Sequence, residues 1–143
     1  MANSHYAAFL NGILGAHATR VDLDADTIKM ALVDNGSVDG APDAATDDFW
    51  DDQSAGLIGT PYTLVNKTIG TVAAGVFDNT VDPAPAFTAV SGVTVESLVF
   101  YKDTGVEATS DLLWFFDTAT GLPLTPNGGD VNVTFSASGI SKT

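Results

Sequence analysis

Closely spaced aspartates are the residues of this chain whose pattern comes nearest to a known site chemistry. Asp22, Asp24 and Asp26 alternate as do the carboxylates that open a calcium-binding loop. Such a loop also needs glycine at its sixth position and glutamate at its twelfth, where this chain has Thr27 and Val33. We therefore expect a solvated turn here, and no metal site.

A second acidic group surrounds two aromatic residues in the stretch DDFWDD. Its carboxylates allow a weak divalent-cation site, but a different interpretation is favoured. Phe49 and Trp50 would anchor a loop in the body of the protein or in a partner, while the acids stay in water. Phe49 and Trp50 are therefore candidate interaction residues.

Catalytic groups are sparse. His5 and His17 are the only histidines, there is no cysteine, and neither histidine has companions for a metal site. Asp103 and Asp117 end apolar runs, where burial would suit acid–base catalysis, but aspartates at such places more often start turns. With no phosphate-binding loop and no G-x-S-x-G nucleophile, we expect no enzyme, no catalytic residue and no cofactor.

The stretch PNGGD, residues 126–130, contains the glycines best placed to hold a ligand. It lies between an apolar run and an alternating run, and no helix follows whose N-terminus would bind a phosphate. Gly128 and Gly129 can supply the positive φ that a tight reversal needs. The stretch is predicted to be a turn.

Composition limits the partners. The chain has 143 residues, 45% of them apolar, with 18 acidic and 5 basic residues and a net charge of -13. Such a charge repels phosphate backbones and anionic bilayers, so we expect neither nucleic acid nor membrane as a partner. The first residues lack the features of a secretory signal, which indicates synthesis and retention in a cytoplasm. One domain spanning residues 1–143 is expected.

The elements that must position these residues are mainly strands. Residues 4–15 predict a short helix capped by Ser4, with an apolar stripe of Tyr6, Phe9, Leu10, Ile13 and Leu14. Residues 27–34 predict a strand, and 35–60 a long surface loop. Further strands are expected within 62–79, 86–90, 93–103, 111–117 and 131–140.

At least six strands with regularly spaced turns are typical of an antiparallel β-sandwich or a small barrel. The predicted core contains Ile28, Met30, Leu98, Phe100, Val133 and Phe135.

The run from Leu112 to Phe116 is apolar on both faces, so both faces of this strand must be covered. Either the N-terminal helix covers the outer face, or a symmetric mate or another protein does. In the second case the interaction surface is formed either by Leu113 and Phe115 or by Leu112, Trp114 and Phe116. If the run is internal, that surface is to be sought around Phe49 and Trp50.

The run FYKDTGVEATSDLLWFFDTATGLPLTPNGGDVNVTF, Phe100 to Phe135, resembles a family of small structural proteins of tailed bacteriophages. The N-terminal half fits more loosely, through DTIKMALVD and DFWDDQSAG. The resemblance implies a jelly-roll-like β-sandwich that binds the major capsid protein. The ending SASGISKT departs from it, because members tend to end in a basic, aromatic segment.

Two functions follow as expectations. The first is a capsid cement or decoration protein on the capsid exterior, which stabilises the mature head and associates with itself as a dimer or higher oligomer. The second is a virion protein of the tail or its fibres, such as a carbohydrate-binding module. Exposed aromatic side chains along a groove would favour the second function, and apolar contacts across a symmetric patch the first.

Overall fold

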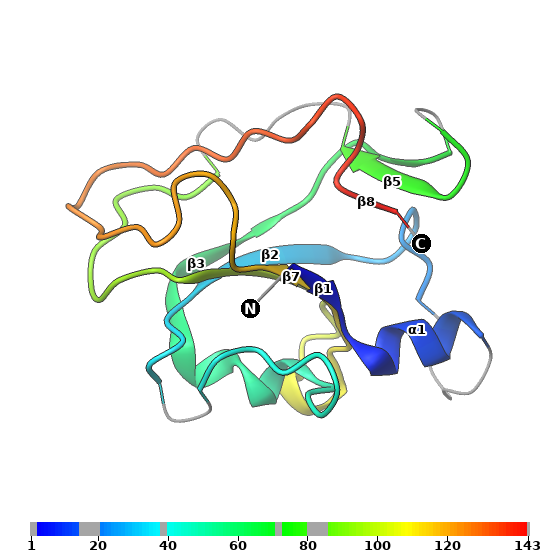
Figure 1. Cartoon of the computed structure of the whole chain (residues 1–143), viewed down its shortest axis with the longest axis horizontal. Helices are drawn as coiled ribbons and strands as arrows, with labels where there is room; N and C mark the ends of the chain where they lie inside the picture. The colour runs from blue at the N-terminus through cyan, green and yellow to red at the C-terminus, as the bar shows by residue number, and fades with distance from the viewer. Residues whose placement is uncertain (1–2, 15–20, 38–39, 71–72, 80–85, 143) are drawn as a thin grey trace.

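The chain folds into two antiparallel β-sheets with one short helix, as predicted (Figure 1). The computed structural model describes residues 3–14, 21–37, 40–70, 73–79 and 86–142. Among these residues the five-stranded sheet has the order β1-β7-β6-β2-β3 and the three-stranded sheet the order β4-β5-β8. The strands are β1 (Ser4–His5), β2 (Ile28–Val33), β3 (Leu57–Thr63), β4 (Lys67–Ile69), β5 (Val76–Asn79), β6 (Ser97–Lys102), β7 (Leu112–Phe116) and β8 (Ser141–Lys142).

The three central strands of the larger sheet are apolar on both faces because both faces are covered. Met30 on β2 pairs with Phe100 on β6, which pairs with Trp114 on β7, so these side chains form one row. They belong to the main core, which lies between the two sheets and includes Phe77 and Ile140 of the smaller layer. The predicted core residues Ile28, Met30, Leu98 and Phe100 are all buried.

A second, smaller core lies on the opposite face of the five-stranded sheet. It contains Ala31, Val99 and Phe115 from the central strands, together with Tyr6 and Trp50. The covering layer on this face is the chain's own segment 40–56, visible below the sheet in Figure 1. This segment includes the 3-10 turns η1 (Trp50–Asp52) and η2 (Ser54–Gly56), and a third turn, η3 (Glu107–Thr109), lies beside η1.

The helix is shorter than predicted. α1 spans Ala7–Ile13 with Tyr6 at its N-cap, and Ser4 is not a cap but part of β1, paired with Phe115 of β7. Backbone pairing to β7 holds Ser4 and His5 in an extended conformation, and the Tyr6 N–H continues it by donating to the Leu113 carbonyl at 3.1 Å. Tyr6 and Phe9 of the expected stripe are buried, whereas Leu10, Ile13 and Leu14 are exposed. Gly15 and His17 lie outside the described residues.

The predicted loop 35–60 is also shorter, because β3 begins at Leu57. Residues 57–60, which include Gly59, belong to β3, an edge strand of the sheet, and not to the loop. Such a strand also tolerates Pro61, because its outer N–H groups need no partner strand. Gly59 has a φ of +72° and lies opposite the register shift between Met30 and Leu32 of β2. A strand with a bulge lacks the clean alternation that sequence patterns detect.

The expected strand 131–140 forms only in part. Val131 makes an isolated bridge to Phe87, the only pairing described in the predicted strand 86–90, and β8 begins only at Ser141. Val133 and Phe135 pack against the main core but stay partly exposed, and Ala137 is exposed. The predicted inward alternation of Val131, Val133, Phe135 and Ala137 is right for the first three, whose burial is incomplete, and wrong for Ala137.

Candidate interaction surface

Trp50 does not lie on the surface. Its indole is 4% exposed and stacks on the ring of Tyr101, with centroids 4.3 Å apart and planes at 5°. Its backbone N–H donates to the Ser110 carbonyl at 2.8 Å. Trp50 thus anchors segment 40–56 in the body of the protein, one of the two roles predicted for it.

Trp114 is the centre of an aromatic cluster in the main core. Its ring stacks on Phe100 at 5.1 Å and contacts Phe77 at 5.4 Å and Phe9 at 5.9 Å. Phe115 points to the opposite face, where its ring lies 5.3 Å from that of Tyr6. The strand Leu112–Phe116 is therefore internal.

These positions correct the expected interaction surface. Trp50, Trp114 and Phe115 are buried, while Phe49 and Phe116 are partly exposed. The two expected alternatives for the outer face of β7 were the N-terminal helix and a second protein. Neither describes the structure fully, because segment 40–56 and Tyr6 cover this face, whereas Phe9 of the helix packs in the main core. A binding surface must lie elsewhere.

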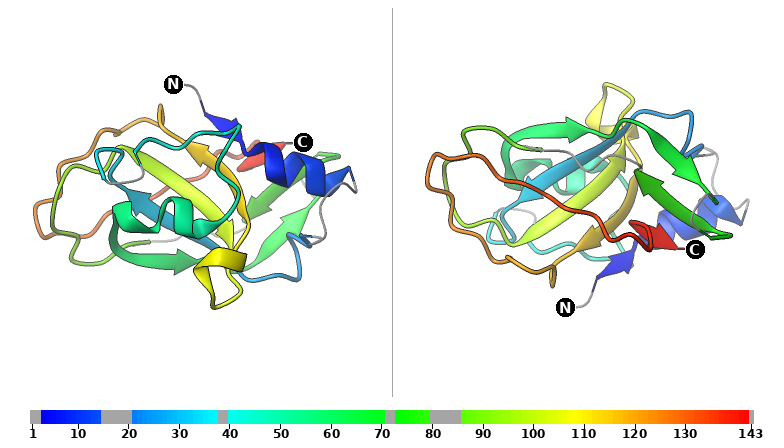
Figure 2. Two further views of the ribbon diagram at one scale, coloured as in Figure 1. Left: turned by 90° about the horizontal axis from the view of Figure 1, so that it is seen from below. Right: turned by 90° about the horizontal axis from the view of Figure 1, so that it is seen from above.

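A hollow lies between residues 119–124 and residues 130–136, and we call it the groove. It comprises a hollow of about 500 Å³ and a neighbouring one of about 220 Å³, and both are lined by Leu98, Ala119, Val133 and Thr134. Leu32 lines the larger hollow, and Phe116 and Phe135 line the smaller one. Figure 2 (right) shows the chain after residue 130, in orange to red, crossing the face of the five-stranded sheet above this region.

Residues 126–130 form the predicted turn, and its last residue, Asp130, lines the groove. Gly128 has a φ of +83°, and its N–H donates to the Val90 carbonyl at 2.8 Å. The Val90 N–H in turn donates to the Gly129 carbonyl at 2.9 Å. Gly128 has the positive φ that the sequence predicted for this turn, and Gly129 does not.

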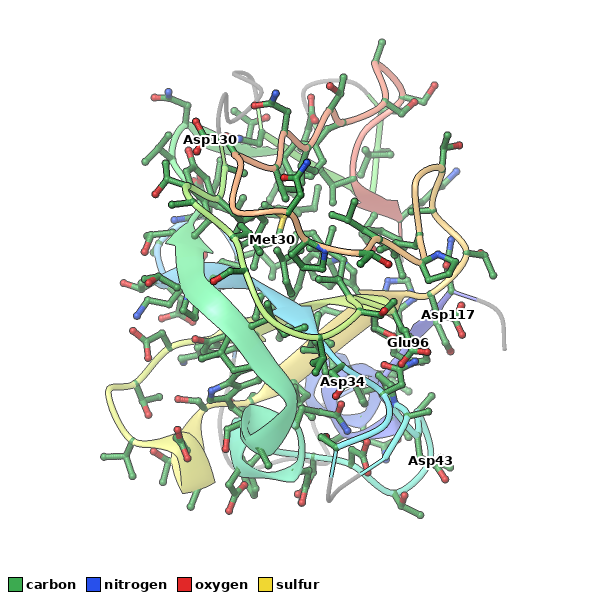
Figure 3. The ribbon with its side chains drawn as sticks, turned by 90° about the vertical axis from the view of Figure 1, so that its left-hand side faces the viewer. Met30, Asp34, Asp43, Glu96, Asp117 and Asp130 are labelled. Carbon is green, nitrogen blue, oxygen red and sulfur yellow. The ribbon has the colours of Figure 1, made fainter. Side chains whose placement is uncertain are left out.

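Acidic residues surround this end of the molecule. Asp130 lines the groove, and its Oδ1 accepts the Ala89 N–H at 2.9 Å. Glu96 is next to Val95, and Val95 pairs with Leu124 in the wall formed by residues 119–124. Asp117 lies two residues before the start of that wall. Figure 3 shows Asp130 on one side of this end and Glu96 and Asp117 on the other, with Met30 between them. None of the described lysines lines the groove.

The ion pairs given by the described residues lie elsewhere. Lys102 Nζ is 2.9 Å from Asp26 Oδ2, and Lys29 Nζ is 2.6 Å from Asp103 Oδ2. The pKa of Asp26 is lowered, because its carboxylate accepts a backbone N–H from Asp22 and bonds to Lys102, which together outweigh its burial. The bond from Lys29 lowers the pKa of Asp103.

The aspartates that suggested a calcium loop form the predicted turn. Asp22 Oδ1 accepts the N–H groups of Asp24 and Ala25, each at 3.2 Å. Asp103 also starts a turn, because its Oδ1 accepts the Gly105 N–H. Among the described residues no three His, Cys, Asp or Glu side chains are grouped to hold a metal ion.

The acids around Phe49 repel one another. Burial raises the pKa of Asp47 and Asp48, and the neighbouring carboxylate of Asp52 raises both further. Asp52 Oδ2 accepts the N–H groups of Asp48 and Phe49, which fixes η1 in place. The carboxylate of Asp52 therefore stabilises the 3-10 turn that contains Trp50.

His5 links the two sheets where the chain ends meet. Its Nε2 lies 2.6 Å from Ser141 Oγ on β8, and its ring stacks on Phe9 at 5.9 Å. Burial lowers the pKa of His5. The sequence could not foresee this contact, because its two members are 136 residues apart.

Comparison with known proteins adds no relative. No family model matches the chain, and no curated protein matches it. Among the described residues no helix has the length and apolar character that crossing a bilayer requires.

Proposed function

We propose that this protein is a bacteriophage capsid cement or decoration protein, which binds the major capsid protein on the exterior of the mature head. The observation that carries the proposal is the place of the run Phe100–Phe135, which resembles small phage structural proteins. This run supplies strand β7, one complete wall of the groove, and most of the other wall. The residues behind the resemblance thus build both the centre of the sheet and the open groove.

The aromatic residues bear on the alternative, a tail or fibre protein that binds carbohydrate. Sugar-binding grooves present tryptophan or tyrosine rings on which the sugar stacks. The chain has two tryptophans and three tyrosines, all within the described residues. Four of them are buried, and Tyr62 on the edge strand β3 is half-buried and does not line the groove. This distribution favours adhesion to protein over binding of a sugar.

Charge bears on the kind of partner. The net charge is -13, and two of the five cations, Lys29 and Lys102, are already paired with aspartates. A strongly acidic surface associates fastest with a basic partner surface and is repelled by packaged DNA. An external position on a capsid, reached from the host cytoplasm, agrees with both requirements.

Self-association on the particle is part of the proposal. The apolar side chains that the chain leaves most exposed include Ile13 and Leu14 of α1 and Ile69 of β4. Helix α1 and the hairpin of β4 and β5 lie at the same end of the molecule (Figures 1 and 2). A contact between copies through this end would bury them.

The test uses purified protein and mature capsids of the phage that encodes it. Sedimentation of the mixture and reconstruction of the particle should show regularly repeated density on the outside of the head. Particles that lack the protein should release DNA at a lower temperature, and addition of the protein should restore the higher one. Density confined to the tail would support the alternative, and absence from the particle would refute both.

A further inference from the structure

Among the described residues, the layer that covers the main core is incomplete beside residues 131–136. The described strands of the three-stranded sheet do not include this part of the chain, and the described backbone pairing of residues 128–131 is with Phe87 and Val90. The apolar residues next to it pack on the main core but remain partly exposed: Phe116, Leu122, Leu124, Val131, Val133 and Phe135. A complete sandwich would bury these residues beneath a neighbouring strand.

The backbone of this segment also has a free edge. Val131 exchanges both of its backbone hydrogen bonds with Phe87, at 3.1 and 2.8 Å. In an extended strand the next residue points its N–H and C=O to the opposite flank. Asn132 and Thr134 both line the larger hollow. Within the described part of the chain, Asn132 and Thr134 have no hydrogen-bond partner for these groups.

Residues 119–124 form the other wall of the groove, across from Asn132 and Thr134, and would contact a bound peptide chain. Leu124 is held by its two hydrogen bonds to Val95, at 2.8 and 2.7 Å. Leu98 and Ala119 line both hollows, and the side chain of Ala119 is small. The lining is mixed, with apolar Leu98, Leu122, Leu124 and Val133 beside polar Asn132 and Thr134.

We propose that the groove accepts an extended segment of a partner protein, which adds as a β-strand beside Asn132 and Thr134. Strand addition takes affinity from main-chain hydrogen bonds and specificity from alternate side chains. The guest would place small or β-branched apolar side chains toward Leu98 and Val133. It would carry lysine or arginine at its ends, because Asp130 lines the groove, Glu96 and Asp117 lie at the same end of the molecule, and no described lysine lines the groove. Only the identity of the partner, the capsid protein, rests on the proposed function.

The first experiment tests the groove alone. The probe is a blocked peptide of alternating valine and threonine with a lysine at each end, and its control has glutamate at both ends. The lysine peptide should slow amide hydrogen exchange at Asn132 and Thr134, since their N–H groups become bonded. Binding should weaken when salt rises from about 0.05 to about 0.5 M, because the Debye length shortens. The glutamate peptide should bind more weakly or not at all.

Matched variants locate the site. Ala119→Trp fills the groove and should lower affinity by at least about tenfold, as occlusion of a central pocket does. Ala108→Trp makes the same change on exposed η3, outside the groove, and should leave affinity unchanged. Asp130→Asn keeps an acceptor for the Ala89 N–H while removing the charge, and should reduce the salt dependence. Asp24→Asn removes an exposed charge from the turn 22–26 and is its control. Circular dichroism melts verify that each variant is folded.

The second experiment separates this proposal from the proposed function. The same four variants are tested for occupancy on mature capsids. If the unmodified protein binds capsids and folded Ala119→Trp binds them equally well, the groove proposal is wrong while the capsid function stands. If the peptide binds and protects both amides but no capsid is bound, the groove proposal stands and the capsid function fails.

Peptide binding without protection of Asn132 and Thr134 would show that the peptide does not add as a strand, and would overturn the groove proposal. If the peptide does not bind, loss of capsid binding in Ala119→Trp but not in Ala108→Trp still supports the groove. If neither probe is affected by Ala119→Trp, the groove has no such role.

Discussion

The indole of Trp50 lies face to face on the ring of Tyr101, although 50 residues of chain separate them, and the rings are 4.3 Å apart at 5°. This pair joins the segment 40–56 to the central strand β6, and so closes the second face of the sheet. The relationship explains why a chain so acidic around Phe49 still folds back on itself. The aromatic contact outweighs the repulsion between the neighbouring carboxylates.

Trp50→Ala should therefore destabilise the protein strongly. Removal of a buried large aromatic side chain costs about 3–5 kcal/mol, through lost burial and the cavity left behind. Leu14→Ala is the control, because Leu14 is 83% exposed, and it should change stability little. Urea unfolding measures both. A loss near zero for Trp50→Ala would mean that segment 40–56 does not close the sheet in solution.

His5 should make stability dependent on pH below neutrality. Burial lowers the pKa of His5 below its ordinary value of 6.5, so the unfolded chain takes up a proton at a higher pH than the folded chain. The contribution of a neutral His5 is fully present above pH 6.5 and is lost as pH falls through the lowered pKa. Thermal melts between pH 7.5 and pH 4.5 should show a decline in Tm that His5→Gln reduces.

The pH dependence of Tm can also contradict this prediction. If the difference in Tm between His5→Gln and the unmodified protein stays constant over this range, the protonation of His5 is not coupled to folding. Ser141→Ala tests the contact itself. It removes the hydroxyl 2.6 Å from His5 Nε2 and should lower stability at every pH, because the partly buried nitrogen loses its partner.

The central strands were predictable from the sequence because their environment leaves a simple pattern. β6 and β7 are covered on both faces, so nearly every residue from Leu98 to Phe115 within these strands is apolar. Edge elements leave no such pattern. β1 has two residues that pair with β7 over a separation of more than 100 positions, and β3 contains Gly59 and Pro61.

The alternating segment and the turn of the groove were predictable from the sequence, but the way these elements come together was not. The alternation from Val131 to Phe135 was visible, and it correctly identified the side chains that face the core. The sequence does not indicate on which side the backbone of this segment lacks hydrogen-bond partners. Aromatic residues also gave a misleading signal, because Trp50 and Trp114 suggested a surface patch while long-range contacts with Tyr101 and Phe100 bury them.

Asp48→Asn should stabilise the protein at neutral pH. Burial and the carboxylates of Asp52 and Asp51 raise the pKa of Asp48 in the folded state above the ordinary 3.8. The folded chain therefore binds this proton more tightly than the unfolded chain, and the charged form opposes folding at pH 7. The gain in Tm should shrink as pH falls toward 4, where the aspartate becomes protonated. Asp24→Asn is the control for loss of charge alone, and an equal effect of both variants at pH 7 would refute a local cause.

Gly128 should tolerate asparagine better than valine. Its φ of +83° lies in the left-handed region, which asparagine enters at modest cost and a β-branched residue avoids. Space does not distinguish the two, because a Cβ at this position would meet no atom within 4 Å. We expect Gly128→Asn to lose a few tenths of a kcal/mol of stability and Gly128→Val to lose about 1–2 kcal/mol, by conformational strain.

The hydrogen bond from the Gly128 N–H to the Val90 carbonyl also holds the turn beside the groove, so Gly128→Val should weaken peptide binding in parallel with stability. Urea unfolding measures the first effect and peptide titration the second. Equal stability of the two variants would show that the turn relaxes to another conformation, whereas lost peptide binding with unchanged stability would make Gly128 a direct contact of the guest.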